Sequence, residues 1–537
     1  MPQGQFAKGA ETFSRFRDVL IYMFMLILAL YLSLQSHFMP FSDFNLGHDA
    51  GIFAYIGFGI KKGLVLYTEL WENKGPLLYF INFFGVLIHE RYGIFLIELL
   101  SLYIAVLFAY NTARLFAGRG VSVISVIYTF LMLPLLLERG NLSEEYALPF
   151  ICAGIYILSK FYFQNYSLKW YQCTISGAMF AGAFLLRANL VAAFAAFGLV
   201  LITVLIVERN YMAIINYGLL VLTGMISVAI PIAFYLYRNN ALTACLNSAY
   251  LGVMKGFNPP TVHVKLKVTL RMMAKLNNSY LYILFFFFII TAVYMASTRK
   301  QIKIERLLLL ISSTFAFALN IYANSISGVY HPHYYMSFIP IILIPSVIFW
   351  DILYKLVLKL LLILNKKAAG LKFTSIVVIS GICLSLSLNN IQSNNKVIIT
   401  SLQKAAYIQD TISYKLSRYI VENTEPDDRI YFLTYSGATT VLYRAKRLAA
   451  SKYSYLPINL ESFTTQRRKE MVAEAVSELL QRHPVMLIVD PLWYEEFLGF
   501  LDNKQQWEDF IVHNYIEAAD VDGFNMLKLI DTVDMHQ

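Results

Sequence analysis

The side chains best suited to chemistry occur in short polar connectors between long apolar stretches. The first connector contains Asp49, in the run His48-Asp-Ala-Gly51, and Lys74, in the run Trp71-Glu-Asn-Lys-Gly-Pro76. A carboxylate can take a proton as a general base, and an ammonium group can stabilise a departing phosphate. Asp49 also stands where an N-cap is favourable, and Lys74 can instead extend its ammonium group from a helix end to water.

A second connector carries two adjacent carboxylates, Glu144 and Glu145, at the start of an apolar stretch. They are candidates for catalytic carboxylates. Their alternative role is structural, because Ser143 can cap the following helix while both glutamates favour its positive end. Either interpretation places the two carboxylates at the water-facing end of a membrane helix.

Basic and aromatic residues complete the candidate site. Arg187 falls in a turn with no room for a loop, so it is predicted to face a cavity or to pair with a carboxylate. His331, His333 and Tyr334 precede a late apolar stretch and belong either to the site or to an interfacial aromatic belt. The two histidines lack the spacing of known zinc motifs, so a divalent metal is allowed but not indicated.

Composition excludes a water-soluble enzyme. The chain has 537 residues, of which 58% are hydrophobic and 15% charged, and its mean hydropathy is +0.56, outside the usual range of soluble domains. The net charge of +10 does not indicate a nucleic-acid partner, because the basic residues flank apolar stretches instead of forming a patch. The four cysteines have no paired spacing, so neither disulfides nor a zinc site are predicted.

The apolar stretches predict about eleven membrane spans. Basic residues before the first span place the amino terminus in the cytoplasm, by the positive-inside rule. The run Pro76 to Ile88 is too short to cross the bilayer and is predicted to be an interfacial or re-entrant helix. The predicted spans lie near residues 19–38, 92–116, 121–138, 145–163, 171–187, 189–207, 213–237, 281–297, 306–323, 336–354 and 373–389.

The segments on the far side of the membrane are the outer loops 40–90, 138–146, 238–280 and 324–335, and a tail. The tail contains two β-like runs, at 429–434 and 485–490, with helical patterns at about 400–421 and 465–482. We therefore predict a polytopic α-helical membrane protein in which residues 1–390 form the transmembrane module and 391–537 form a small extracytoplasmic α/β domain.

At these residues the sequence resembles the polytopic glycosyltransferases of the GT-C type, in particular the family of protein O-mannosyltransferases and lipid A aminoarabinose transferase, glycosyltransferase family 39. The resemblance covers roughly residues 15–390. It is carried by Asp49, by the segment from Tyr67 to Tyr79 around Lys74, by the acidic Glu144/Glu145 connector, and by the run His331-Pro-His-Tyr-Tyr335. Gly75 departs from the family pattern, in which two prolines often follow the lysine.

The resemblance implies transfer of a sugar from a polyprenyl-phosphate donor to an envelope lipid, glycan or protein acceptor. It implies that Asp49 is the catalytic carboxylate, that Lys74 contacts the carrier phosphate, and that Glu144 or Glu145 supports them. No cofactor and no nucleic acid are expected. The same chemistry also follows without the resemblance. If the acceptor hydroxyl attacks the anomeric carbon opposite the phosphate, the configuration inverts, and one carboxylate suffices as the base.

In this mechanism Arg187, His331 and His333 add positive charge around the phosphate, and Tyr334 belongs to the substrate-binding group. The expected location is the plasma membrane of a bacterium, with the C-terminal domain outside the cell. The alternative functions are a transporter or flippase of envelope glycolipids, and a non-catalytic scaffold. A transporter should place ionisable residues near the midplane of broken helices, whereas this chain concentrates them at the outer ends.

Overall fold

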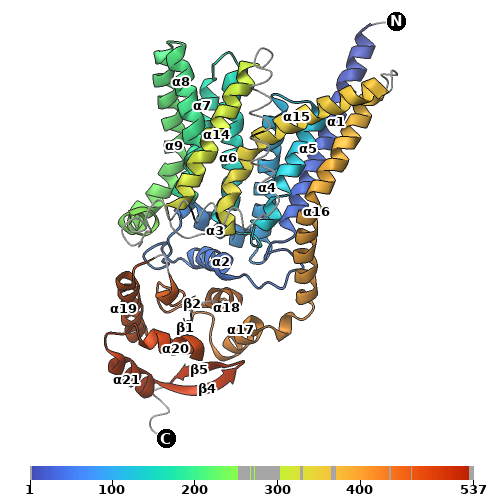
Figure 1. Cartoon of the computed structure of the whole chain (residues 1–537). Coiled ribbons are helices and arrows are strands. Elements are labelled where there is room, and N and C mark those ends of the chain that lie inside the picture. Colours follow the sequence, from blue (N-terminus) through green and yellow to red (C-terminus); the bar gives the residue numbers. More distant parts are fainter. Residues whose placement is uncertain are drawn as a thin grey trace.

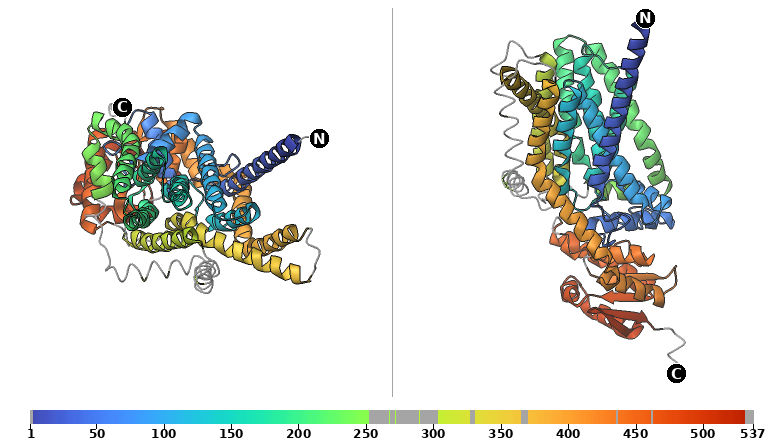
Figure 2. Two further views of the ribbon diagram at one scale, coloured as in Figure 1. Left: turned by 90° about the horizontal axis from the view of Figure 1, so that it is seen from above. Right: turned by 90° about the vertical axis from the view of Figure 1, so that its right-hand side faces the viewer.

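The computed structural model describes residues 3–251, 267, 271, 289, 303–326, 331–364, 370–434, 437–460 and 463–530. It has two layers, a bundle of long helices and a smaller unit of helices and a sheet stacked on one end of that bundle (Figure 1). The N-terminal end of the chain lies at the opposite end of the bundle from the C-terminal unit (Figure 2).

The bundle consists of long apolar helices with short connectors. They are α1 (Gln3–Ser33), α4 (Gly93–Arg114), α5 (Arg119–Phe130), α6 (Ser143–Phe163), α7 (Trp170–Leu186), α8 (Ala192–Val207), α9 (Tyr211–Arg238), α14 (Ile304–Ser325), α15 (Ile339–Leu364) and α16 (Leu371–Ala405). In the part of the chain that the structure describes, eight segments are long and apolar enough to cross a membrane. The chain is therefore an integral membrane protein.

The structure differs from some of the predicted spans. The span expected near 121–138 is α5 followed by a 3-10 turn, η1 (Leu133–Leu135), because Pro134 has no N–H with which to continue the helix. Helix α16 continues unbroken beyond the expected end at 389. The span expected near 171–187, in contrast, agrees with α7 to within one residue at each end. The expected span 281–297 and most of the outer loop 238–280 lie outside the described residues.

Two shorter helices lie between the bundle and the C-terminal unit. Helix α2 (His48–Lys61) runs across the end of the bundle, and α3 (Pro76–Ile88) packs against it (Figure 1). The bounds of α3 coincide with the short apolar run predicted from the sequence. Further short turns are η2 (Ala188–Val191), α10 (Leu242–Cys245), η3 (Leu246–Leu251) and η4 (Pro332–Phe338).

The C-terminal unit is built around a five-stranded sheet of order β2-β1-β3-β5-β4. Its strands are β1 (Arg429–Leu433), β2 (Leu448–Ala449), β3 (Met486–Val489), β4 (Tyr515–Val521) and β5 (Phe524–Leu529). β1 pairs in parallel with β2 and β3, and β5 pairs antiparallel with β3 and β4. Its helices and turns are η5 (Ile408–Asp410), α17 (Ile412–Asn423), α18 (Ala438–Ala445), η6 (Pro457–Asn459), α19 (Thr465–Arg482), α20 (Pro491–Leu498) and α21 (Lys504–Asn514).

The sequence predicted β1, β3 and α19 but not the hairpin formed by β4 and β5. Asp522 and Gly523 form its turn, with φ of 52° and 85°. An Asp-Gly pair with both residues at positive φ is typical of the tight turn that joins two antiparallel strands. The Asp522-Gly523 dipeptide was therefore the feature of the sequence from which β4 and β5 could have been predicted.

Direct contacts fix the C-terminal unit on helix α2. The backbone N–H of Ala449 donates to the Tyr55 hydroxyl at 2.8 Å, and α18 packs on α2. The backbone N–H of Trp71 donates to the carbonyl of Lys452 at 3.0 Å. Both contacts lie within a few residues of the candidate site residues on α2 and in the segment before α3.

Candidate active site

The candidate site lies where α2 and the segment before α3 meet the ends of the membrane helices. Residues from five parts of the chain converge there: Asp49 on α2, Glu72 and Lys74 before α3, Glu144 at the start of α6, Arg187 after α7, and His333 and Tyr334 on η4. The sequence separation of these parts means that only the folded chain assembles the site.

Asp49 is half-buried in the first turn of α2 and interacts electrostatically with Lys74 and His333. Burial alone would raise the pKa of its carboxyl, but the charge of Lys74, followed by that of His333, holds this pKa below its ordinary value. The N-cap of α2 is Gly47, and no side chain caps this end. The proposed capping role of Asp49 is therefore wrong, because the helix begins at His48, two residues earlier than that role requires.

The backbone of Lys74 is held on both sides. The Tyr67 hydroxyl donates to the Lys74 carbonyl at 2.7 Å, and the Lys74 N–H donates to the Tyr79 hydroxyl at 3.2 Å. Its side chain is half-buried and interacts with Asp49 and Arg187. Lys74 is therefore held within the charged cluster.

Gly75 brings this segment against the turn that follows α7. Its N–H donates to the carbonyl of Leu186 at 3.1 Å, and a Cβ here would lie 2.0 Å from the carbonyl oxygen of Leu185. Neither proline nor any residue with a side chain fits this approach, since proline lacks the N–H and any Cβ would clash. The departure from the family pattern at Gly75 thus has a structural reason.

Glu72 lies in the segment around Lys74 that carries the family resemblance, but its role could not be predicted from the sequence. Its side chain is buried, the N–H of Asn73 donates to Oε1 at 2.6 Å, and the Tyr455 hydroxyl donates to Oε2 at 3.3 Å. Burial raises the pKa of this carboxyl, against the opposing effect of Lys74. No pattern in the sequence indicates that a residue of the C-terminal unit reaches Glu72.

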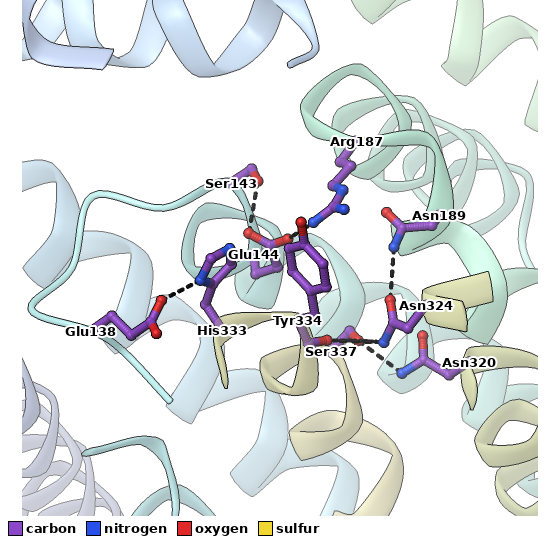
Figure 3. A network of polar contacts seen from close by, with 10 residues as sticks. All are labelled: Glu138, Ser143, Glu144, Arg187, Asn189, Asn320, Asn324, His333, Tyr334 and Ser337. Atoms are coloured by element: carbon purple, nitrogen blue, oxygen red, sulfur yellow. Dashed lines mark hydrogen bonds and ion pairs between the residues drawn. The ribbon is translucent and has the colours of Figure 1, made fainter. Parts of the chain in front are cut away.

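Arg187 connects the acidic and aromatic sides of the site. Its guanidinium pairs with Glu144 and lies over the ring of Tyr334, 3.9 Å from the ring centroid (Figure 3). Ser143 donates to Glu144 Oε2 at 2.8 Å and does not cap α6, whose N-cap is Leu142. The expected cap is absent because the helix starts at Ser143 itself.

The side chains of Glu144 and Glu145 lie in different surroundings. Glu144 contacts Arg187, whereas Glu145 interacts with the buried Glu98 of α4. Among the described residues, Glu98 Oε1 and Glu145 Oε2 have no hydrogen-bond partner, and Ser36 donates to the other Glu98 oxygen at 2.5 Å. The structure therefore brings Glu144, and not Glu145, into contact with the other candidate residues.

The histidines occupy the side of the site next to α6. His333 is buried and contacts Glu138 through Nδ1 (Figure 3). The more exposed His331 stacks on it with ring centroids 5.2 Å apart. Glu138 begins a run of four consecutive residues with positive φ that ends at Asn141. Such left-handed backbone is costly for residues other than glycine, so tertiary contacts must hold this loop against His333.

A chain of amides and a hydroxyl lies behind Tyr334. Asn189 donates to Asn324 at 2.7 Å, Asn324 donates to the Tyr334 carbonyl at 3.0 Å, and Asn320 donates to Ser337 at 2.8 Å (Figure 3). Buried hydrogen-bonded networks restrict side-chain and backbone movement. This network fixes η4 and therefore also the ring of Tyr334, over which the Arg187 guanidinium lies.

Among the residues that the structure describes, no group of three or more histidine, cysteine, aspartate or glutamate side chains is arranged to hold a metal ion. His331 and His333 were the metal ligands that the sequence allowed. Their rings stack on each other, and His333 also contacts Glu138.

In fold the chain is similar to the crystal structure of ArnT from Cupriavidus metallidurans bound to undecaprenyl phosphate, with a TM-score of 0.58 and 13% identity over 96% of this chain and 98% of that chain. The apo state of that protein gives a TM-score of 0.57 at 13% identity, with the same coverage. AglB from Archaeoglobus fulgidus, in complex with an inhibitory peptide and a dolichol-phosphate, gives 0.46 at 12% identity over 97% of this chain and 75% of that chain. No curated protein matches the sequence.

The architecture defines a polytopic membrane protein with the GT-C fold and a small C-terminal sheet unit, as the resemblance predicted. Residues 11–361 match the family described as "Putative competence-induced protein Ccs4 N-terminal domain". The chain belongs to this family.

Proposed function

We propose that this protein is a membrane glycosyltransferase that takes a sugar from a polyprenyl-phosphate carrier and transfers it to an acceptor of the cell envelope. The proposal rests on the convergence of a carboxylate, Asp49, with the cations Lys74 and Arg187 at one end of the bundle. The fold supports the donor class, because ArnT, which shares it, was crystallised with undecaprenyl phosphate.

In the proposed reaction Asp49 takes the proton of the acceptor hydroxyl as that oxygen attacks the anomeric carbon. The bond from this carbon to the carrier phosphate breaks on the opposite face, so the configuration inverts and no covalent sugar intermediate forms. Lys74 and Arg187 stabilise the phosphate as it gains negative charge. Glu144 and Tyr334 orient the guanidinium of Arg187 for this contact.

The electrostatics of the site link donor binding to the strength of the base. Lys74 is the largest influence that lowers the pKa of Asp49. A donor phosphate that neutralises Lys74 would remove part of this influence, and burial would then raise the pKa of Asp49. The carboxylate would thus become a stronger base when the donor is in place, which favours proton transfer at that stage.

A lipid carrier also explains the position of the site at the end of the membrane helices. We propose that this end faces the outside, that the amino terminus is cytoplasmic, and that residues 1–390 and 391–537 act as the catalytic module and an extracytoplasmic domain. The basic residues at the other end of the helices support this orientation, since cytoplasmic ends of spans are enriched in lysine and arginine.

The transporter alternative is less well supported. Within the described spans, the buried acidic side chains lie toward helix ends, as Glu98, Glu144 and Glu145 do, or near a basic connector, as Asp351 does through Arg306. Transport of a charged substrate favours ionisable groups near the bilayer midplane. This distribution favours an enzyme that acts at one face.

The proposal can be tested by replacing the base and the phosphate ligand separately. Cells lacking the protein would be complemented with Asp49→Asn, Lys74→Ala or the surface controls Asp427→Asn and Lys62→Ala, and their envelope lipids, polysaccharides and proteins compared by mass spectrometry. We expect the sugar modification to be lost with Asp49→Asn and restored by both controls. Undecaprenyl phosphate binding to the purified protein should weaken in Lys74→Ala but persist in Asp49→Asn. Full modification in Asp49→Asn cells would exclude the catalytic role.

A further inference from the structure

A second polar cavity lies at the opposite end of the bundle from the candidate site. It has a volume of about 500 Å³ and lies among the end of α4, the starts of α5 and α14, and the middle of α15. Helix α4 has 22 residues, and at a rise of about 1.5 Å per residue it separates the two ends by roughly 33 Å. The cavity therefore plays no part in the proposed transfer reaction.

Positive charge predominates in this cavity. Four cationic side chains line it, against two carboxylates, Glu305 and Asp351; the cations are Arg114, Lys303, Arg306 and Lys355. Asp351 pairs with both Arg306, at 3.0 Å, and Lys355, at 2.8 Å. One carboxylate thus compensates two cations and holds them in place.

The other two cations form no ion pair among the residues that the structure describes, although the charge of Arg114 also acts on the carboxyl of Asp18. Arg114 donates to the carbonyl of Ala117 at 2.5 Å, and Lys303 is exposed at the cavity edge with no ion pair. A cation that forms no ion pair and lies beside a cavity favours an anionic ligand.

Two helix starts add to the positive potential. Gly118 and Lys303 are the N-cap residues of α5 and α14, and both line the cavity. No side chain in the described part of the chain caps either helix. The free N–H groups at helix starts carry partial positive charge and bind phosphate or carboxylate groups.

Apolar surfaces extend from the cavity along both neighbouring helices. On α14, beyond Lys303, the exposed side chains are Ile304, Leu307 and Ile311. On α15, beyond Lys355, they are Leu356, Leu360 and Ile363, which are between 57% and 69% exposed. Their three- and four-residue spacings place each set on one helix face, which would lie against acyl chains in a membrane.

We propose that this cavity binds the headgroup of an anionic phospholipid from the leaflet at the N-terminal end of the bundle. The phosphate lies among Arg114, Lys303 and Arg306, and the acyl chains follow the apolar faces of α14 and α15. These faces favour a lipid over a soluble phosphate, which would gain nothing from them.

The test compares lipid retention by the full-length protein in nanodiscs and by native mass spectrometry. The probes are phosphatidylglycerol, zwitterionic phosphatidylethanolamine and inorganic phosphate. We expect one phosphatidylglycerol retained per chain and at least tenfold weaker retention in both Lys303→Glu and Arg114→Gln. The matched control Lys372→Glu, which changes an exposed lysine at the start of α16, should retain the lipid as the unmodified protein does.

Several outcomes would overturn the proposal. Equal retention of phosphatidylethanolamine would show that negative charge is not recognised, and unchanged retention in the two cavity variants would place the lipid elsewhere. Displacement of the lipid by inorganic phosphate at low concentration would identify a soluble anion as the ligand. Because Lys303 is exposed, its substitution leaves the packing of the bundle intact and the result can be interpreted.

Discussion

Gly75 and Leu186, more than a hundred residues apart in the chain, are joined by a backbone hydrogen bond of 3.1 Å. This contact presses the segment before α3 against the turn after α7, so that Lys74 and Arg187 face the same space. The two cations repel each other, and the neighbouring carboxylates Asp49 and Glu144 offset part of this repulsion. The backbone contact and these carboxylates keep the two cations together, as the proposed phosphate site requires.

Gly75→Ala should therefore separate the two cations. The new Cβ would stand 2.0 Å from the Leu185 carbonyl oxygen, and the resulting displacement should cost about 1–3 kcal/mol of stability. We expect loss of undecaprenyl phosphate binding and of sugar transfer. Gly198→Ala, on membrane helix α8 with nothing within 4 Å of the new Cβ, is the matched control. Equal binding in both variants would contradict the role of this contact.

The two glutamates at the start of α6 should respond differently to neutral substitution. Glu144→Gln leaves the guanidinium of Arg187 without its carboxylate partner, at a cost of up to about 3 kcal/mol, and should weaken donor use. Glu145→Gln replaces one of two adjacent buried carboxyls, since Glu98 lies beside it, and should preserve transfer while raising the melting temperature. Both would be measured by transfer assay and thermal unfolding. A loss of transfer in Glu145→Gln alone would reverse the assignment.

Much of the architecture could be predicted from the sequence because it depends on local patterns. The length of an apolar run decides whether a helix can span a membrane, and Pro76 to Ile88 was correctly predicted as a separate short helix. The β-branched and apolar runs of β1 and β3 were likewise found. Prediction was weakest where proline or turn chemistry changes a local pattern, as at Pro134 and at the turn before β5.

The site could be predicted only in part. Asp49 and Lys74 were singled out because ionisable groups at membrane depth are costly and cluster on one side, and because their segments resemble a family motif. The structure has the two residues in electrostatic contact; their roles stay predictions. Glu72 and Glu138 could not be assigned, because their surroundings depend on Tyr455 and His333, which are distant in the chain. Long-range contacts of single side chains leave no periodic signal in a sequence.

Tyr334 is expected to act through its ring. Arg187 lies 3.9 Å from the ring centroid, and such a cation–π contact contributes about 1–2 kcal/mol when partly desolvated. Tyr334→Leu should therefore weaken donor affinity by roughly tenfold, whereas Tyr334→Phe, which keeps the ring, should come close to the unmodified protein. Apparent donor KM for both variants measures this. A large loss in Tyr334→Phe would instead assign the role to the hydroxyl.

The acidity of Asp49 should depend on the charge at residue 74. Lys74 is the largest influence lowering this pKa, and burial acts in the opposite direction. Lys74→Met removes the lowering influence, so the pKa of Asp49 should rise and the carboxyl should become protonated at higher pH. Lys74→Arg keeps the charge and should leave the pKa low. Carbodiimide labelling of Asp49 as a function of pH, read by peptide mass spectrometry, reports this directly; identical profiles would show that the two residues do not interact.

Glu72 should be a position where stability and function conflict. Burial raises the pKa of its carboxyl above the ordinary 4.5, so the folded chain binds this proton more tightly than the unfolded chain. The protonated carboxyl therefore stabilises the folded chain at pH values below the pKa that Glu72 has in the unfolded chain. This stabilisation is lost as the pH rises through the pKa that Glu72 has in the folded chain. At neutral pH Glu72→Gln should therefore raise the melting temperature, and this gain should disappear in acid.

Glu474→Gln is the control of opposite sign. Burial would raise the pKa of Glu474, but hydrogen bonds from Lys452 and Tyr453 hold it below its ordinary value, so its neutralisation should lower stability at neutral pH. Thermal unfolding of both variants across the acid-to-neutral range distinguishes the two cases. If Glu72→Gln also reduces sugar transfer while raising the melting temperature, the buried charge is retained for function at the expense of stability. A lower melting temperature in Glu72→Gln at neutral pH would mean that its contacts with Asn73 and Tyr455 outweigh the burial of its charge.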